Sequence, residues 1–119
     1  MRQLLWVFRG TALAALLLGL ANLLLGFLPP PVIDTHMLFG VLAVLSAWGL
    51  LWRQRGSGLG RAGMGLAAVL LVLGLGQRLR WWGAPGVDLM GLVHLAVALG
   101  MMAVVEMSAA RARRAIPRP

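Results

Sequence analysis

The sequence has no cysteine, no lysine and only three acidic residues, Asp34, Asp88 and Glu106, among its 119 positions. Without cysteine the chain cannot form disulfides, zinc–thiolate sites, iron–sulfur clusters or a covalently attached c-type haem. Charged residues make up 12% of the chain, against about a quarter in water-soluble domains, and hydrophobic residues make up 61%. This composition excludes a soluble enzyme, a disordered tail and a conventional DNA-binding domain. It predicts a small integral membrane protein.

The charge that is present is almost all positive, with eleven arginines and a formal net charge of +8. The arginines lie at the ends of apolar segments, where they anchor and orient a membrane protein, so no nucleic-acid partner is expected. Arginine without lysine, together with many leucines, alanines and glycines, is typical of a GC-rich bacterial genome. We therefore expect a multi-pass protein of the bacterial inner membrane.

Four apolar segments approach the length of about 20 residues that a membrane-spanning helix needs. The predicted spans cover residues 4–28, 33–52, 61–82 and 87–107, and a basic tail follows at 108–119. Residues 29–31 are prolines that stop the first span, and glycine-containing stretches separate the others. The first segment is long for a signal peptide and no small-x-small site follows it, so we expect a retained span. The predicted fold is one all-α domain, a membrane four-helix bundle built from two helical hairpins.

The distribution of arginines predicts the orientation of these spans. If the N-terminus is cytoplasmic, nine arginines lie inside and only Arg78 and Arg80 lie outside. Because cytoplasmic segments carry the excess of positive charge, both termini are expected in the cytoplasm. The tail is expected to contact anionic lipid headgroups.

A weak internal repeat relates the second and fourth spans. PPVIDTHMLFGVLAV and APGVDLMGLVHLAVA each have a proline turn, then an aspartate, then a histidine. The two histidines, His36 and His94, therefore lie on different helices in the outer half of the membrane. Their offset from the aspartates differs by four residues, about 6 Å of helix rise, which ordinary tilt or stagger absorbs. We expect the two imidazoles to face each other.

A facing pair of histidines suits one low-spin haem b, with His36 and His94 as the axial ligands of its iron. A flat macrocycle also needs small side chains beside the ligands. The sequence supplies them on the same helical faces, at Gly40, Ala43, Gly91 and Ala98.

The polar residues at the outer end of the third span fit the same hypothesis. Arg78 and Arg80, the two arginines that break the orientation rule, would pair with the haem propionates. Gln77 would hydrogen-bond a ligand histidine or a propionate. One haem per chain is the limit, because the chain has two histidines.

Other interpretations of these residues stay open. The histidines would also suit helix ends that face interfacial water, and Arg78 and Arg80 would also suit headgroup contacts. Small residues four apart, such as Ala15 and Gly19, predict close helix packing. Methionines beside both histidines, Met37 next to His36 and Met90 four residues before His94, would suit Cu(I).

The acidic residues have structural interpretations. Asp34 and Asp88 follow turns and are expected to cap the helices that begin there. Glu106 is expected to form an interfacial ion pair with the arginines that follow it, namely Arg111, Arg113 and Arg114.

The stretches HMLFGVLAVLSAW, LGLGQ and HLAVALGMMAVVEMSAARARR resemble a group of small, largely uncharacterised bacterial membrane proteins with four spans. The resemblance implies that His36, Gln77, His94 and Glu106 belong to the pattern of that group. More distantly, the arrangement is similar to membrane b-type cytochromes, four-helix bundles with histidine ligands. The small multidrug-resistance transporters have a similar length and four spans, but they need a carboxylate in the first span, and residues 4–28 contain none.

The sequence thus predicts a haem b-binding membrane protein that transfers electrons or serves as a subunit of a redox complex. An enzyme is not expected, because an iron with two histidine ligands has no open position for a substrate. The expected partners are membrane lipid, a redox partner or other membrane subunits, or further copies of the chain. The alternative is a ligand-free structural or assembly subunit of the membrane.

Overall fold

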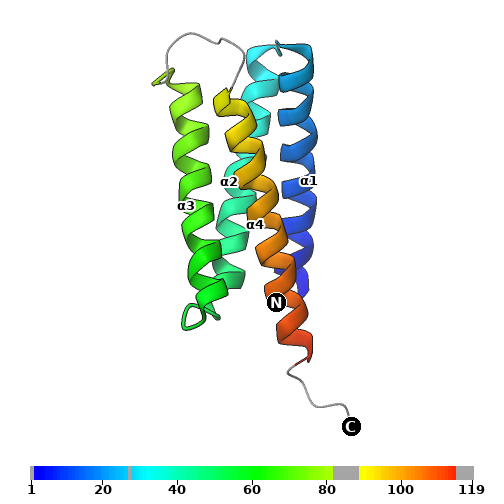
Figure 1. Cartoon of the computed structure of the whole chain (residues 1–119). Helices are drawn as coiled ribbons and strands as arrows, with labels where there is room; N and C mark the ends of the chain where they lie inside the picture. The colour runs from blue at the N-terminus through cyan, green and yellow to red at the C-terminus, as the bar shows by residue number, and fades with distance from the viewer. Residues whose placement is uncertain (1, 27, 82–88, 115–119) are drawn as a thin grey trace.

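The computed structural model describes residues 2–26, 28–81 and 89–114, and in these residues the chain is helical throughout apart from turns. The helices are α1 (Arg2–Leu25), α2 (Pro30–Trp52), α3 (Gly58–Arg78) and α4 (Leu89–Arg114), shown in Figure 1. They contain 21 to 26 residues, or about 31–39 Å of helix against a bilayer core of about 30 Å. All four are long and apolar enough to cross a membrane, which fits a multi-pass membrane protein.

The turn between α1 and α2 is set by a glycine and by prolines. Gly26 has a φ of +69°, and its N–H donates to the carbonyl of Asn22 over 2.9 Å, an αL motif that ends α1 three residues before the expected limit of the span. Prolines then open α2, where their missing N–H is harmless. α2 therefore begins at Pro30 and not at residue 33.

The other helix ends also differ from the expected limits of the spans. Ser57 caps α3 by accepting a hydrogen bond from the N–H of Gly60 at 3.0 Å, so α3 begins at Gly58 and not at residue 61. α4 continues to Arg114, well into the segment expected to be a tail. The residues at 82–88, which include the predicted cap Asp88, and those at 115–119 lie outside the described chain.

The helices run alternately up and down (Figure 1). α1 packs mainly on α2, and α3 packs on both α2 and α4, whereas α1 and α4 meet over a smaller part of their length. The end where α1 begins, α2 ends, α3 begins and α4 ends carries most of the arginines and is called the arginine end below. The opposite end, which holds His36 and His94, is called the histidine end.

The tightly packed core lies toward the arginine end. Its largest fully buried side chains are Phe8, Val44, Leu51, Met101 and Val105. Glycine allows the closest approach there: a Cβ at position 63 would lie 2.7 Å from side-chain atoms of the helices on either side. Large apolar side chains also face outward on every helix, and one of them, Leu24, is 74% exposed. An apolar exterior of this kind suits lipid contact.

The histidine end is packed less tightly. Along the helices, the buried side chains of the core stop at Ala15, Ala43, Leu70 and Met101. Beyond these levels, Gly76 is the only buried residue in the described part of the chain. The bundle is therefore packed most tightly toward the arginine end.

Candidate functional site

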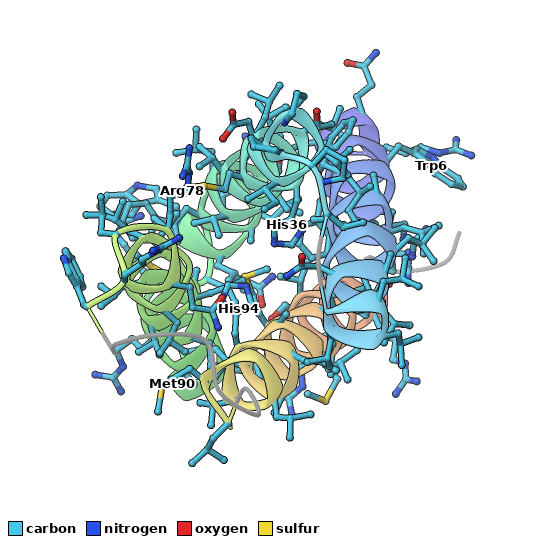
Figure 2. All side chains as sticks on the ribbon, turned by 90° about the horizontal axis from the view of Figure 1, so that it is seen from above. Trp6, His36, Arg78, Met90 and His94 are labelled. Atoms are coloured by element: carbon cyan, nitrogen blue, oxygen red, sulfur yellow. The ribbon has the colours of Figure 1, made fainter. Side chains whose placement is uncertain are left out.

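His36 of α2 and His94 of α4 meet inside the histidine end of the bundle. Their ring centroids are 6.2 Å apart and their ring planes are inclined by 49°. Figure 2, a view down the bundle, shows both side chains inside the ring formed by the four helices. The structure thus brings together two imidazoles from residues 58 positions apart in the sequence.

The His36 ring is fixed in orientation and tautomer by helix α1. Its Nδ1 lies 2.8 Å from the backbone carbonyl of Ala15. Since a carbonyl only accepts hydrogen bonds, Nδ1 carries the proton and donates it. The lone pair of the neutral ring is then on Nε2, the atom that ligates a metal when Nδ1–H is held by a backbone carbonyl.

His94 lies in a different environment. Its Nδ1 is buried and has no hydrogen-bond partner among the described residues. The same holds for the side-chain Nε2 of Gln77, which lies one turn beyond Gly74 on α3. A buried polar group without a partner costs about 1–3 kcal/mol. These two atoms lie on adjacent helices at the histidine end, where a polar ligand would supply the missing partners; the third such atom in the described chain, Oγ of Ser108, lies in the packed half.

The four small residues expected beside a macrocycle occupy two kinds of position. Gly40 is partly buried, and a Cβ built on it meets no atom within 4 Å, so space is open beside it. Gly91 is also partly buried and lies one turn before His94. Ala43 belongs to the buried core and Ala98 packs against that core. The two alanines therefore lie at the level where the packed half of the bundle begins.

Arg78 and Arg80 lie at the histidine end, both exposed. An Nη2 of Arg78 donates to Oδ1 of Asp34 at 3.2 Å, and both side chains of this pair are at least half exposed. The prediction that Asp34 caps α2 was wrong: α2 begins four residues earlier, at Pro30, and its N-terminus has no side-chain cap. Asp34 instead connects α2 to α3 beside the histidines.

Glu106 forms an ion pair, as expected, but its partner is not one of the three arginines that follow it in the sequence. Its carboxylate accepts two hydrogen bonds of 2.6 Å from Arg9 of α1, one from Nε and one from Nη2. This bidentate pair connects α1 with α4 toward the arginine end and is separate from the histidine pair.

One of the two methionines expected at a copper site lies away from the histidine pair. Figure 2 places Met90 at the periphery of the bundle, while His94 points into it. No three histidine, cysteine, aspartate or glutamate side chains of the described chain lie close enough together to hold a metal ion. A metal bound by the two histidines would therefore have no third histidine, cysteine or carboxylate ligand from the described chain.

The separation of the two rings fits an iron held between them. A metal–imidazole bond is about 2 Å and the ring centre lies roughly 1 Å behind its nitrogen, which places two ligating rings about 6 Å apart. The observed separation of the centroids is 6.2 Å. Even if both rings pointed directly at each other, the gap between their nitrogens would be about 4 Å, too long for a direct hydrogen bond. The separation is therefore too large for a direct hydrogen bond between the rings and is of the size expected for two imidazoles bound to one metal ion.

Sequence reasoning did not identify the residues on which the imidazoles rest. These are Ala15, through its carbonyl, and the glycines Gly19 of α1 and Gly74 of α3. The spacing of Ala15 and Gly19 had predicted close helix packing only. The signal that could have identified them is a glycine on the helix that precedes each histidine helix.

Comparisons with known proteins give no further information on the site. No protein-family model matches the chain, and neither does any curated protein or solved structure.

Proposed function

We propose that this chain is a haem b-binding protein of the bacterial inner membrane, with His36 and His94 as the two axial ligands. The observation that carries the proposal is the 6.2 Å separation of two imidazoles inside a bundle of membrane-length helices. A haem with two histidine ligands supplies one-electron transfer, since its iron has no open position for a substrate. The chain is therefore an electron carrier or a subunit of a redox complex, and a redox partner or other membrane subunits would contact it.

Each proposed ligand has a distinct role. His36 would ligate through Nε2, because its Nδ1–H is held by the Ala15 carbonyl. His94 would ligate from α4, and the ligand would complete the environment that leaves its Nδ1 and the Gln77 amide without partners. Gly40, where a Cβ would meet no atom within 4 Å, would leave room for one edge of the macrocycle.

The propionates would be held by arginines at the histidine end. Arg78 of α3 is paired with Asp34 through a hydrogen bond of 3.2 Å. Because both groups are half exposed, this pair is weak and a propionate would compete for the guanidinium at little cost. Arg80 is exposed two residues further on and is available to the second propionate.

The bundle would consist of two hairpins, α1 with α2 and α3 with α4, with both termini in the cytoplasm. The arrangement of the arginines supports this orientation, since Arg78 and Arg80 are the two that lie at the histidine end. The haem would then lie in the outer half of the membrane.

The proposal is tested by visible spectroscopy of protein purified in mild detergent from cells supplied with haem. The wild type is expected to show a sharp Soret band and, after dithionite, resolved α and β bands. His36→Ala and His94→Ala are expected to lose these bands. Met90→Leu is the matched control, one turn from His94 but at the periphery of the bundle, and it is expected to keep the full spectrum.

Two outcomes would overturn the proposal. A colourless wild type that is folded and was made with ample haem would favour a ligand-free structural or assembly subunit. Copper in the purified protein without a Soret band, lost in Met90→Leu, would favour a copper site.

A further inference from the structure

Each of the two imidazoles rests edge-on against a glycine of the preceding helix. A Cβ built on Gly19 of α1 would lie 2.9 Å from Cε1 of His36 and 3.4 Å from its Nδ1. A Cβ built on Gly74 of α3 would lie 3.1 Å from Cε1 of His94. The first distance is shorter than real Cβ contacts, and the second is tighter than most of them. Glycine at these positions therefore determines how far each imidazole reaches toward its neighbouring helix.

The two contacts differ in how freely the imidazole can yield. His36 is fixed by its hydrogen bond to the Ala15 carbonyl, one turn from Gly19 on the same helix. A side chain at position 19 would break that bond and displace the ring. His94 has no such bond at Nδ1, so it would yield more easily to a side chain at position 74. A substitution at position 19 is therefore expected to have the larger effect.

The same arrangement occurs in both halves of the chain. In each half the first helix supplies the glycine and the second supplies the histidine. Glycine is a poor helix former, so replacing a glycine inside a helix with alanine normally stabilises the helix. Alanine at position 19 would gain helix propensity but would force the His36 ring to shift. Alanine at position 74 would require the His94 ring to give by a few tenths of an ångström.

We propose that Gly19 and Gly74 are positioning residues of the histidine pair. Because neither has a side chain, each imidazole can lie against the helix of its glycine, and this fixes the 6.2 Å separation of the two ring centroids. This inference rests on the proposed haem function, because two histidines can ligate one iron only at a particular separation of their rings. Neither glycine would contact the haem, since each acts through its histidine.

The test compares Gly19→Ala and Gly74→Ala with matched controls on the same helices. Gly10→Ala on α1 and Gly65→Ala on α3 add a methyl group that meets no atom within 4 Å. We expect Gly19→Ala to reduce the low-spin haem fraction about tenfold, the size of effect seen when the support of a metal ligand is removed. Gly74→Ala should reduce it less, and both controls should keep the wild-type spectrum. Wild-type spectra for Gly19→Ala would overturn the inference and leave the proposed function standing.

A second measurement separates this inference from the proposed function. In haem-free protein, NMR should show a through-space cross-peak between the His36 ring proton on Cε1 and the Gly19 α-protons, and between the corresponding protons of His94 and Gly74. If the wild type binds no haem, the haem proposal fails, and these cross-peaks still decide whether the glycines position the rings. Their absence would overturn the inference.

Failure of Gly19→Ala to fold would also be informative. The double variant with His36→Ala removes the ring that the new methyl group meets. Recovery of the fold in the double variant would support the contact, and continued misfolding would contradict it.

Discussion

Arg80 has a φ of 56°, a left-handed conformation that glycine usually adopts. It follows the last turn of α3, where its N–H donates to the carbonyl of Gln77 and the N–H of Trp81 donates to that of Gly76. These two hydrogen bonds form a Schellman motif with arginine at the position where glycine is most common. Arg80 therefore holds a left-handed conformation at the end of α3 although it carries a side chain.

Replacing Arg80 with glycine should therefore stabilise the haem-free protein. The left-handed conformation costs a residue with a Cβ about 1–2 kcal/mol, and Arg80→Gly removes that cost. We expect a gain of about 1 kcal/mol in the free energy of unfolding, measured by denaturant titration of the detergent-solubilised chain with circular dichroism. Arg80→Ala is the control, because it removes the charge but keeps the strain. An equal gain in both variants would show that the charge of the Arg80 side chain, and not the conformation of its backbone, destabilises the wild type.

The partners of individual charged residues could be predicted only in part from sequence. The two histidines were expected to face each other, because each follows an aspartate and a proline turn on helices that start at the same end. Asp34 was expected to cap a helix, and its pairing with Arg78 depends on the packing of α2 against α3, which local sequence does not encode. Glu106 pairs with an arginine 97 residues away, although three arginines follow it within eight positions.

The helices themselves were predictable because the apolar runs are long and separated by clear breaks. Their ends were less so, since single residues decide them: Gly26 ends α1 before the prolines, and Ser57 starts α3 earlier than expected. The span predicted at 61–82 ended too late, because the motif at Arg80 closes α3 at Arg78. The glycines beneath the imidazoles were not identified, because the consequence of a missing side chain is visible only when two helices are packed together.

At the level of whole helices, the Arg9–Glu106 pair is the strongest polar link between α1 and α4 in the described chain. These helices otherwise meet over a small part of their length, and both side chains are more than a third exposed on the outside of the bundle. Lipid would surround such a pair, where an unpaired charge is expensive. The pair therefore closes the contact between α1 and α4 toward the arginine end.

A charge-reversal cycle tests this closure. Arg9→Glu and Glu106→Arg should each destabilise the bundle, because each places two like charges together. The double variant should recover much of the loss, with a coupling of roughly 0.5–3 kcal/mol as found for directly contacting residues. Unfolding in increasing SDS, followed by circular dichroism, gives the three free energies. Purely additive losses would show that the pair does not connect the two helices.

For the molecule as a whole, the unequal distribution of arginines predicts one orientation in the membrane. Arg78 and Arg80 are alone at the histidine end, and the other arginines of the described chain lie toward the arginine end. Positive charge is retained on the cytoplasmic side, so the histidine end should face outward.

The absence of cysteine makes this orientation simple to measure. Ser57→Cys places a thiol between α2 and α3 at the arginine end, and Leu79→Cys places one at the end of α3 at the histidine end. In intact cells a membrane-impermeant maleimide should label the cysteine at position 79 and not the one at position 57. Labelling of position 57 alone would show that the orientation is the opposite one. Labelling both variants after the cells are lysed calibrates the assay.

Electron paramagnetic resonance of the oxidised, haem-loaded protein tests the central claim most directly. Two imidazoles 6.2 Å apart that both ligate one iron should give a low-spin ferric signal without a high-spin component. Replacing either His36 or His94 with alanine should abolish this low-spin signal. A high-spin signal from the folded wild type, or the same low-spin signal after His94→Ala, would contradict ligation by this pair.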